Sequence, residues 1–389
     1  MCQSNPVYHE SPALALLEPW MLARLPKVVD LTARQHIIQL AAGIFESHSA
    51  LLANIASSSA FQANTESSNE TQVRRILRDE RLFLASVYYP LIRQLFAEMR
   101  PSVLYLTIDE SSHGSDFNIF SLNLISDATA IPLGWLLYAT DEAWAEDARD
   151  LLTDLARYLP TTAHIIVLAD RIHTGEPFLA RLDELGWDYI FRAPDDTLIE
   201  TRRGWKALKA LRLQPNNGRF LQQVRIWKGS QRRSNLSCYK RARKGFRAVC
   251  WYLVSSLRAA QERFVEYACR WWHECGWKSL KSALFDWERG RIIDPDRLSV
   301  LLIGISCALW AMWLLGREHE HIPQRKPTTT KPPSRRKSII KQGISAFKNA
   351  NKHHRSLVLG TPPQPRVLDD KCMFDELAKN DVMQYSKPK

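Results

Sequence analysis

The stretch SVLYLTIDESSHGSDFNIFSLNLISDATAIPLGWLLYAT, residues 102–140, decides the fold of this chain. Three runs within it, 102–110, 117–127 and 130–140, are rich in β-branched and aromatic residues, and turn residues separate them. Connections this short join neighbouring antiparallel strands, because parallel strands need a long crossover. The stretch therefore predicts three successive antiparallel strands.

The elements that follow this stretch alternate between helix and strand. Residues 141–159 predict a helix with acids in its first turns, where they are favourable against the helix dipole. Residues 164–170 are a short apolar run, as a buried parallel strand would be. Residues 175–186 predict a helix that ends at Gly186, and residues 187–193 predict another strand. The predicted order, βββαβαβ, indicates an α/β fold with a mixed sheet.

Further regions lie on either side of this α/β core. The first hundred residues carry apolar residues at helical spacing. The region 195–255 contains alternating stretches and predicts a mostly β insertion, and a long helix over 257–285 follows it. The predicted division is a helical N-terminal domain that is a candidate DNA-binding module (1–100), the first part of the core (101–194), the basic β-rich insertion (195–255), the second part of the core (256–316) and a basic, flexible tail (317–389).

Positive charge is concentrated in two segments of the chain. The net charge is +12, with 53 Lys and Arg against 41 Asp and Glu. Segment 201–247 has fifteen Lys or Arg, segment 325–355 has ten, and neither contains an acid, so the remaining residues sum to −13. This segregation indicates a polyanionic partner, either nucleic acid or an anionic membrane surface. A merely solvated basic surface is the alternative.

Cysteine usage and hydropathy restrict the class of protein further. The seven cysteines include no CxxC pair, which argues against a zinc site, and the polar N-terminus shows no signal peptide, so we expect a cytoplasmic protein. Residues 298–316 are nineteen residues without a charge, the lower end of membrane-spanning length. Because Arg297 and Arg317 flank this run and give no orientation bias, we expect a buried helix and no membrane partner.

Two acids stand at the ends of predicted strands. Asp109 ends the first strand and Asp170 ends the fourth, and side chains at strand ends project into a common crevice. If the two strands are neighbours, their carboxylates repel each other and need a cation. A pair of oxygen-ligated Mg²⁺ ions is the natural solution, and a two-metal site suits phosphodiester chemistry. Alternatively, each aspartate caps a turn or the following helix.

A third acid stands in the basic, aromatic stretch YACRWWHECGWKSLK, residues 267–281. At 100° per residue, one helix face presents a carboxylate between cations and a tyrosine, because five side chains project within about 80° of arc: Tyr267, Arg270, Glu274, Lys278 and Lys281. An Arg270–Glu274 ion pair at i, i+4 is the purely structural alternative. That pair does not account for the aligned tyrosine and lysine.

The spacing Tyr267-x2-Arg270-x3-Glu274-x6-Lys281 resembles the tyrosine–arginine–glutamate–lysine signature of one group of bacterial insertion-sequence transposases, insertion-sequence family four. LTIDES, with Asp109, looks like the first catalytic aspartate segment of that group, and VLADR, with Asp170, looks like the second. The order βββαβαβ, then a β-rich insertion, then a glutamate helix is similar to the group's ribonuclease-H-like catalytic core. The resemblance covers roughly residues 70–316.

This resemblance implies an enzyme, a DDE transposase that cuts the ends of a mobile element and joins them to target DNA. Asp109, Asp170 and Glu274 would be its catalytic residues and would hold two Mg²⁺ ions, with Mn²⁺ as a substitute. Tyr267, Arg270 and Lys281 would contact phosphates near the cleaved end.

The implied partners are double-stranded DNA at the element's ends and at the target, and a second copy of the chain on that DNA. No small-molecule substrate is implied. The implied location is the bacterial cytoplasm, in association with the nucleoid. A related nuclease or resolvase, and a catalytically inactive transposase derivative that only binds DNA, are the alternatives.

Two more side chains are candidate DNA contacts. Trp271 projects near the face of Glu274, where it could stack on an unpaired base, although core packing is the simpler function of any one tryptophan here. Arg171, next to Asp170, could reach a phosphate or pair with an acid on the sheet. Gly276, inside the glutamate helix, would allow close approach of DNA or of the neighbouring helix.

Overall fold

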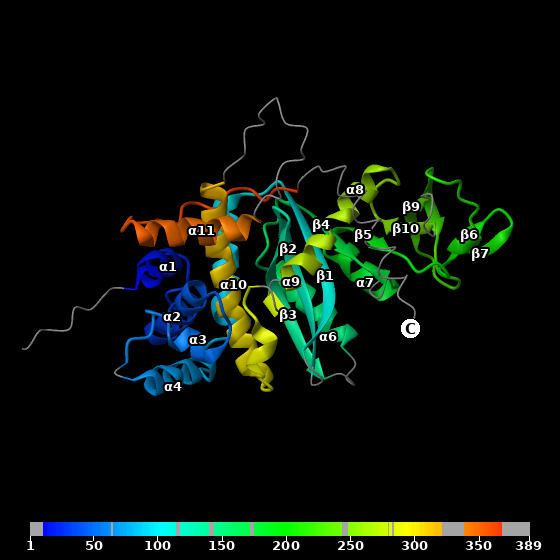
Figure 1. The fold of residues 1–389 in the computed structure, drawn as a ribbon. Helices are drawn as coiled ribbons and strands as arrows, with labels where there is room; N and C mark the ends of the chain where they lie inside the picture. Colours follow the sequence, from blue (N-terminus) through cyan, green and yellow to red (C-terminus); the bar gives the residue numbers. More distant parts are fainter. Residues whose placement is uncertain are drawn as a thin grey trace, which may run out of the picture.

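An eight-stranded mixed sheet forms the centre of the protein (Figure 1). The computed structural model describes residues 11–63, 65–113, 117–139, 144–171, 175–242, 248–278, 280–281, 284–320 and 338–367. The strands of the sheet lie in the order β3-β2-β1-β4-β5-β10-β9-β8, in which only β1, β4 and β5 pair in parallel. Their bounds are β1 Val103–His113, β2 Phe117–Ser126, β3 Thr129–Ala139, β4 His164–Ala169, β5 Asp188–Arg192, β8 Gly218–Arg225, β9 Arg233–Arg241 and β10 Val249–Ser255.

The first seven elements of this α/β core follow in the predicted order, with α6 (Ala145–Ala156) and α7 (Glu176–Glu184) between the strands. β2 and β3 form a tight hairpin, because Asp127 and Ala128 at its turn both have positive φ, 52° and 58°. Such turns match the natural twist of two paired strands. One boundary differs from the prediction, because β1 continues to His113 along its partner β2 and does not end near Asp109.

The basic region extends the central sheet. β10 pairs antiparallel with β5, and β9 and β8 follow it outward, so these three strands continue the sheet. A two-stranded ribbon of β6 (Leu198–Thr201) and β7 (Gly204–Ala207) stands beyond them, at the end of the molecule away from the N-terminal helices (Figure 1). A short 3-10 turn, Leu208–Ala210, follows β7.

The prediction of one long helix over 257–285 was wrong. The structure has two shorter helices, α8 (Glu262–Ala268) and α9 (Trp271–Lys278). Between them the backbone bonds tighten to i→i−3, with Arg270 N–H donating to Tyr267 O and His273 N–H donating to Arg270 O. Tertiary contacts set the direction of α9, since a Cβ on Gly276 would lie 2.9 Å from the Cβ of Ala130 and 3.1 Å from its backbone N on β3.

Helices of the N-terminal hundred residues pack on the long helix α10 (Pro295–Glu318) and share one hydrophobic core with the sheet (Figure 1). Gly304 of α10 lets α2 approach closely, since a Cβ there would lie 2.9 Å from Leu40. The bounds of these helices are α1 Pro12–Leu22, α2 Leu31–Ser47, α3 Leu52–Ala56, α4 Glu66–Leu77, a π-helical turn Leu84–Tyr88 and α5 Tyr89–Met99.

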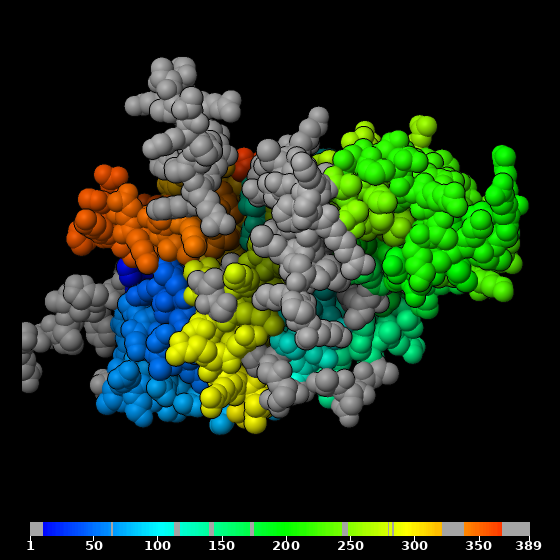
Figure 2. Space-filling view, turned by 45° about the vertical axis from the view of Figure 1, so that its right-hand side comes forward, coloured from blue at the N-terminus to red at the C-terminus, as the bar shows by residue number. Residues whose placement is uncertain are grey.

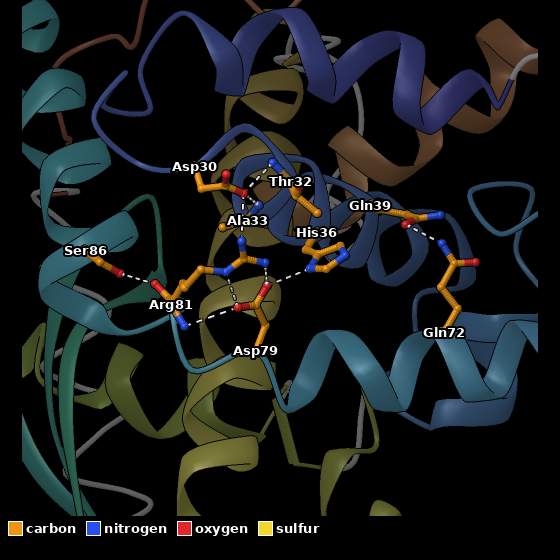
Figure 3. Close-up of polar contacts among 9 residues, drawn as sticks. All are labelled: Asp30, Thr32, Ala33, His36, Gln39, Gln72, Asp79, Arg81 and Ser86. Atoms are coloured by element: carbon orange, nitrogen blue, oxygen red, sulfur yellow. Dashed lines mark hydrogen bonds and ion pairs between the residues drawn. The ribbon is translucent and has the colours of Figure 1, made fainter.

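A polar cluster joins the loop after α4 to α2 (Figure 3). Arg81 donates to Asp79 through Nε and Nη2 and to Asp30 through Nη1, each at 2.7 Å, and His36 Nδ1 lies 2.7 Å from Asp79 Oδ2. The hydrogen bonds from Arg81 lower the pKa of Asp79 to about 2. Asp30 also caps the N-terminus of α2, so the cluster fixes where this helix begins.

α10 is the apolar helix that the sequence predicts over 298–316. Among the described residues it is the one helix long and apolar enough to cross a membrane, and 94% of its most apolar 18-residue window is buried within the protein. The prediction of a buried helix is thus confirmed. A 3-10 turn, Trp287–Gly290, leads into it.

The prediction of a flexible tail from residue 317 was wrong for residues 338–367, here called the strap. The strap begins with α11 (Ile339–Lys352), which packs across α10 (Figure 1). Gly316 and Gly343 allow this contact, because a Cβ on either glycine would collide with the backbone of the other helix. The predicted tail residues 321–337 and 368–389 lie outside the described residues.

The strap ends against the hairpin turn of β2 and β3. Asp127, whose side chain is 3% exposed, pairs with Arg366 at 2.6 Å and with Arg317 of α10 at 2.9 Å. The indole N–H of Trp313 donates to the same carboxylate at 2.9 Å, and Asp127 N–H donates to Arg366 O at 2.9 Å. One buried carboxylate thus joins the sheet, α10 and the strap. A buried charge needs this many partners to be tolerated.

His48 should make the packing of α2 against the strap sensitive to mild acid. Burial, and next the charge of Lys348 on α11, lower the pKa of His48 to about 4. The unfolded chain therefore binds the proton from pH 6.5 downward and the folded chain resists it until about pH 4, so stability falls as the pH drops through this window. We expect the wild type to lose about 1–2 kcal/mol of unfolding free energy between pH 7 and pH 5 from this group.

His48→Asn is the informative variant, because His48 has φ 51° and asparagine tolerates that conformation. Urea unfolding of both proteins at pH 7 and pH 5 should show a smaller acid loss in the variant. Parallel pH dependence in the two proteins would contradict the assignment to His48.

Candidate active site

Asp109 and Asp170 lie next to each other on neighbouring parallel strands. β1 pairs with β4 up to Ile108 and Ala169, which are register partners. Asp109 and Asp170 directly follow this last register pair. Both carboxylates therefore lie where β4 ends and β1 continues. The predicted neighbourhood of these strands is therefore confirmed, although Asp109 lies within β1 and not at its end.

Glu274 approaches this pair from α9, and Arg270 lies among the three acids. Arg270 Nη1 donates to Asp109 Oδ2 at 3.1 Å, and Nη2 donates to Glu274 Oε1 at 2.7 Å. Asp170 interacts electrostatically with Arg270 and with Glu274. The guanidinium is largely shielded from solvent, with a side-chain exposure of 12%. Three carboxylates from three elements therefore share one buried cation.

The pKa values of Glu274 and Asp170 are shifted in opposite directions. Burial raises the pKa of Glu274, and the repulsion of Asp109 and Asp170 adds to it, while Arg270 opposes both without cancelling them. Burial also acts to raise the pKa of Asp170, but the Arg270 charge outweighs it together with the Arg171 N–H and Arg192, so that pKa is lowered. The carboxylates are thus close enough to repel, which is the condition under which an additional cation is favourable.

The donor set has the chemistry of a divalent-metal site. Three carboxylates supply only hard oxygen ligands, which suit Mg²⁺ or Mn²⁺. No group of three His, Cys, Asp or Glu side chains in the described parts of the chain is close enough together to hold an ion as it stands. Arg270 occupies the position between Asp109 and Glu274 and supplies positive charge there. The acids therefore fit a metal in type and charge once Arg270 withdraws.

The other predicted site residues are spread around this centre. Tyr267 is 3% exposed and packs edge-on against Trp251, and Arg270 lies 6.0 Å from the centre of its ring. Lys281 Nζ donates to Ser112 O at 2.7 Å and pairs with Glu288 at 3.0 Å. Tyr267 therefore lies in the core beside Arg270, and Lys281 joins the glutamate segment to β1.

Trp271 and Arg171 lie nearer the surface. Trp271 is half-buried, whereas Trp272 and Trp277 of the same helix are buried in the core. Arg171 has a side-chain exposure of 37%, and its Nε lies 3.9 Å from Asp170. Gly276 allows close approach of β3, as the glycine contact with Ala130 shows, so the neighbour there is a strand and not the predicted neighbouring helix.

Sequence reasoning missed a buried polar layer under the acids. Thr107 and Asn123 are register partners on β1 and β2, both are fully buried, and His273 of α9 contacts both. The signal was present in LTIDES (residues 106–111) and SLNLIS (residues 121–126). In both segments polar residues alternate with apolar ones within an otherwise hydrophobic strand. Arg192, which is 7% exposed at the end of β5, was also missed.

Comparison with known protein families identifies the chain. The profile of the Transposase DDE domain matches residues 111–311, more than half of the chain. The chain belongs to this family. The matched segment contains Asp170 and Glu274 and begins two residues after Asp109. The protein is therefore a DNA transposase, an enzyme that acts on phosphodiester bonds, and transposases of this family generally use divalent metal ions.

Two further comparisons concern individual proteins. No curated protein sequence matches this transposase. Among solved structures it is similar to the cryo-EM structure of the piggyBac transposase synaptic complex with hairpin DNA, with 10% sequence identity and a TM-score of 0.45. That alignment covers 96% of this chain and 83% of the other.

Proposed function

We propose that this transposase cleaves the ends of an insertion sequence and transfers them to target DNA, with Asp109, Asp170 and Glu274 as its catalytic carboxylates. The observation that carries the proposal is the meeting of these three acids, from β1, the end of β4 and α9, on the single guanidinium of Arg270. Burial and the repulsion of the other two acids raise the pKa of Glu274 although Arg270 opposes them, and metal ions would stabilise its charged form. We also assign the sheet and α9 to the ribonuclease-H-like class.

Asp109, Asp170 and Glu274 would hold two Mg²⁺ ions, with Mn²⁺ as a substitute. When bound, such ions lower the pKa of the attacking water or hydroxyl and neutralise the leaving oxygen. Arg270 exchanges partners in this proposal, from the carboxylates to a DNA phosphate, because its fork of donors matches a phosphate as well as a carboxylate. Its position between the acids therefore keeps the site neutralised until DNA arrives.

The other predicted DNA contacts would take their places around Arg270. Lys281, held near β1 by the Ser112 carbonyl, would turn to a phosphate at the cleaved end. Arg171 and the half-buried Trp271 are accessible enough to reach a phosphate and to stack on a base. Tyr267 would act from beneath, by fixing the Arg270 side chain against its ring.

The lobe that contains β6 to β9 offers a second, basic surface for DNA. Figure 2 shows this lobe in green at one end of the molecule, beside the part of the chain that carries α8. Its exposed cations include Arg202 and Arg203 at the turn of the β6–β7 ribbon. No acid occurs between residues 201 and 247, and although Arg225 pairs with Glu200, the cations of the lobe outnumber its acids, so the surface attracts phosphates. We assign this surface to DNA backbone binding.

The double variant Arg202→Ala, Arg203→Ala should weaken DNA binding in a salt-dependent way. Each phosphate contact contributes about 0.9 to the slope of log K against log salt, so losing two should reduce that slope by about 2. Fluorescence anisotropy with a duplex from 50 to 200 mM salt measures it. The matched control is Arg157→Ala, which changes a 70% exposed arginine at the C-terminal end of α6. A slope equal to that of the wild type would remove the ribbon from the DNA interface.

Joining two DNA ends requires two active sites, so we propose a homodimer assembled on DNA, acting in the bacterial cytoplasm on nucleoid DNA. The alternative is a transposase derivative that has kept DNA binding and lost cleavage. Three converging acids favour the enzyme, because binding a polyanion gains nothing from buried carboxylates.

The deciding experiment uses a plasmid that carries this protein's gene together with its flanking chromosomal DNA. Purified wild-type protein with Mg²⁺ or Mn²⁺ should produce cuts at the two boundaries of the element and joined products, whereas EDTA should prevent both. DNA binding without any cleavage in either metal would overturn the proposed activity and favour the binding derivative.

A further inference from the structure

One face of the β1–β2 pair carries a row of polar side chains beside Asp109. Thr107 pairs in register with Asn123, and Asp109 pairs with Ser121. Thr107, Ser121 and Asn123 are all fully buried. Polar groups inside a sheet are tolerated only where partners satisfy them, so this row needs a matching group on the element that covers it.

His273 of α9 is that matching group. Its Nδ1 lies 3.1 Å from Thr107 Oγ1 and 3.1 Å from Asn123 Nδ2, and its side chain is 3% exposed. Its Nε2 lies 3.6 Å from Asp109 Oδ2. The residue directly before Glu274 is therefore seated on the strand that carries Asp109.

The partners of Nδ1 determine which ring nitrogen carries the proton. The Asn123 amide nitrogen can only donate, and its orientation is supported by its approach to the Thr107 carbonyl, which can only accept. Nδ1 therefore accepts and carries no proton. The one ring proton stands on Nε2 and faces Asp109.

The Asp109 carboxylate is thus approached from three sides. Its Oδ1 accepts the Glu110 N–H at 2.9 Å, and its Oδ2 faces both Arg270 and His273. When Arg270 leaves for a phosphate, as the proposed function requires, His273 Nε2, which lies 3.6 Å from Oδ2 and just outside hydrogen-bond distance, would close on that oxygen as a donor. The orientation of this carboxylate then no longer depends on Arg270.

We propose that His273 is a positioning residue for the transposase reaction, which joins the helix of Glu274 to the strand of Asp109 and holds the Asp109 carboxylate in a fixed orientation for the metal. This inference rests on the proposed function of Asp109 and Glu274. α9 has eight residues and is separated from α8, so it is too short to hold its own direction. Its direction is fixed by contacts with the sheet: Gly276 packs against β3, and His273 contacts β1 and β2.

The tautomer is the first test, and it needs no activity. Two-dimensional ¹⁵N–¹H spectra of ¹⁵N-histidine-labelled full-length protein distinguish Nε2-protonated from Nδ1-protonated rings. The signal that His273→Gln removes should have the Nε2–H pattern at pH 8. An Nδ1–H pattern would overturn the proposal.

Metal binding by substituted proteins is the second test, read by Mn²⁺ titration with electron paramagnetic resonance in the presence of a saturating DNA duplex, with the duplex alone as the blank. His273→Leu, which fills the space without a donor, should weaken Mn²⁺ binding about tenfold, in the range of losses seen for groups behind metal ligands. His273→Gln, whose amide can donate in place of Nε2–H, should recover most of it. His164→Gln removes a surface histidine that pairs with Asp188 at the opposite end of β4 and should change nothing.

The outcomes separate the two proposals. Asp109→Asn should abolish the tight Mn²⁺ site, and if it does not, the catalytic assignment itself fails. If Asp109→Asn abolishes the site while folded His273→Leu binds Mn²⁺ like the wild type, only the positioning role fails. Equal weakening in His273→Leu and His273→Gln, with matching losses of melting temperature, would mean that His273 only fills the core, and this also overturns the proposal.

Discussion

A Glu274→Gln enzyme should cleave transposon-end DNA about a thousandfold more slowly than the wild type and bind the same DNA with nearly unchanged affinity. A carboxylate that holds a metal supports several kcal/mol of transition-state charge stabilisation, and each 1.36 kcal/mol is a factor of ten in rate. Glutamine keeps an acceptor for Arg270 Nη2, which donates to Glu274 at 2.7 Å, so the arrangement of α9 should persist. Cleavage under single-turnover conditions, with anisotropy for binding, measures both quantities.

The folded state itself should tolerate this change well. Burial and the neighbouring Asp109 and Asp170 raise the pKa of Glu274, which means that its charge is unfavourable in the folded protein without metal. A neutral glutamine removes that cost. Glu262→Gln, an exposed acid at the start of α8, is the matched control and should cleave at the wild-type rate. Equal cleavage by Glu274→Gln and Glu262→Gln would remove Glu274 from the catalytic set.

Asp127→Asn should lower the free energy of unfolding by about 3 kcal/mol and loosen the strap. The substitution keeps a side chain that tolerates φ 52° but removes the charge that faces Arg317 and Arg366. Removing one partner from a buried ion pair costs about 3–5 kcal/mol, and the remaining amide acceptor recovers a part of this. Urea unfolding gives the energy, and limited proteolysis should show earlier cutting near residue 360.

Asp286→Asn is a close control for this experiment. Asp286 also has a positive φ, 54°, and also pairs with an arginine, Arg289, at 2.7 Å. That arginine is 73% exposed, so the pair contributes at most about 1 kcal/mol. The hypothesis of a buried anchor at Asp127 fails if the two substitutions have equal effects.

Much of the fold could be predicted because its signals are local. Strand composition in 102–140 and the alternation that follows gave the order of the first seven elements, and the positions of Asp109 and Asp170 followed from the parallel pairing of β1 with β4. The helix of Glu274 was harder, since its sequence has continuous helical periodicity and its break after α8 arises from contacts with the sheet. Those contacts, through His273 and Gly276, join residues about 150 positions apart.

The strap could not be predicted for a related reason. The sequence just before it, residues 323–337, is rich in Lys, Pro and Thr, which favours a flexible chain. The order of the strap depends on Gly316 and Gly343 meeting across two helices and on Arg366 reaching Asp127, and a single sequence gives no sign of either contact. The polar layer of Thr107 and Asn123 was visible as a sequence pattern. Its role could be inferred only from the position of His273 in the structure.

The ion pair between Asp127 and Arg366 also has a consequence for how the enzyme is made. Its two partners are 239 positions apart, so the β2–β3 turn emerges from the ribosome long before the arginine that completes its charge balance. Until residue 366 is synthesised, the Asp127 carboxylate lacks one of its two cations, and closing so long a loop is slow. The order of synthesis therefore delays this buried contact until residue 366 has been translated.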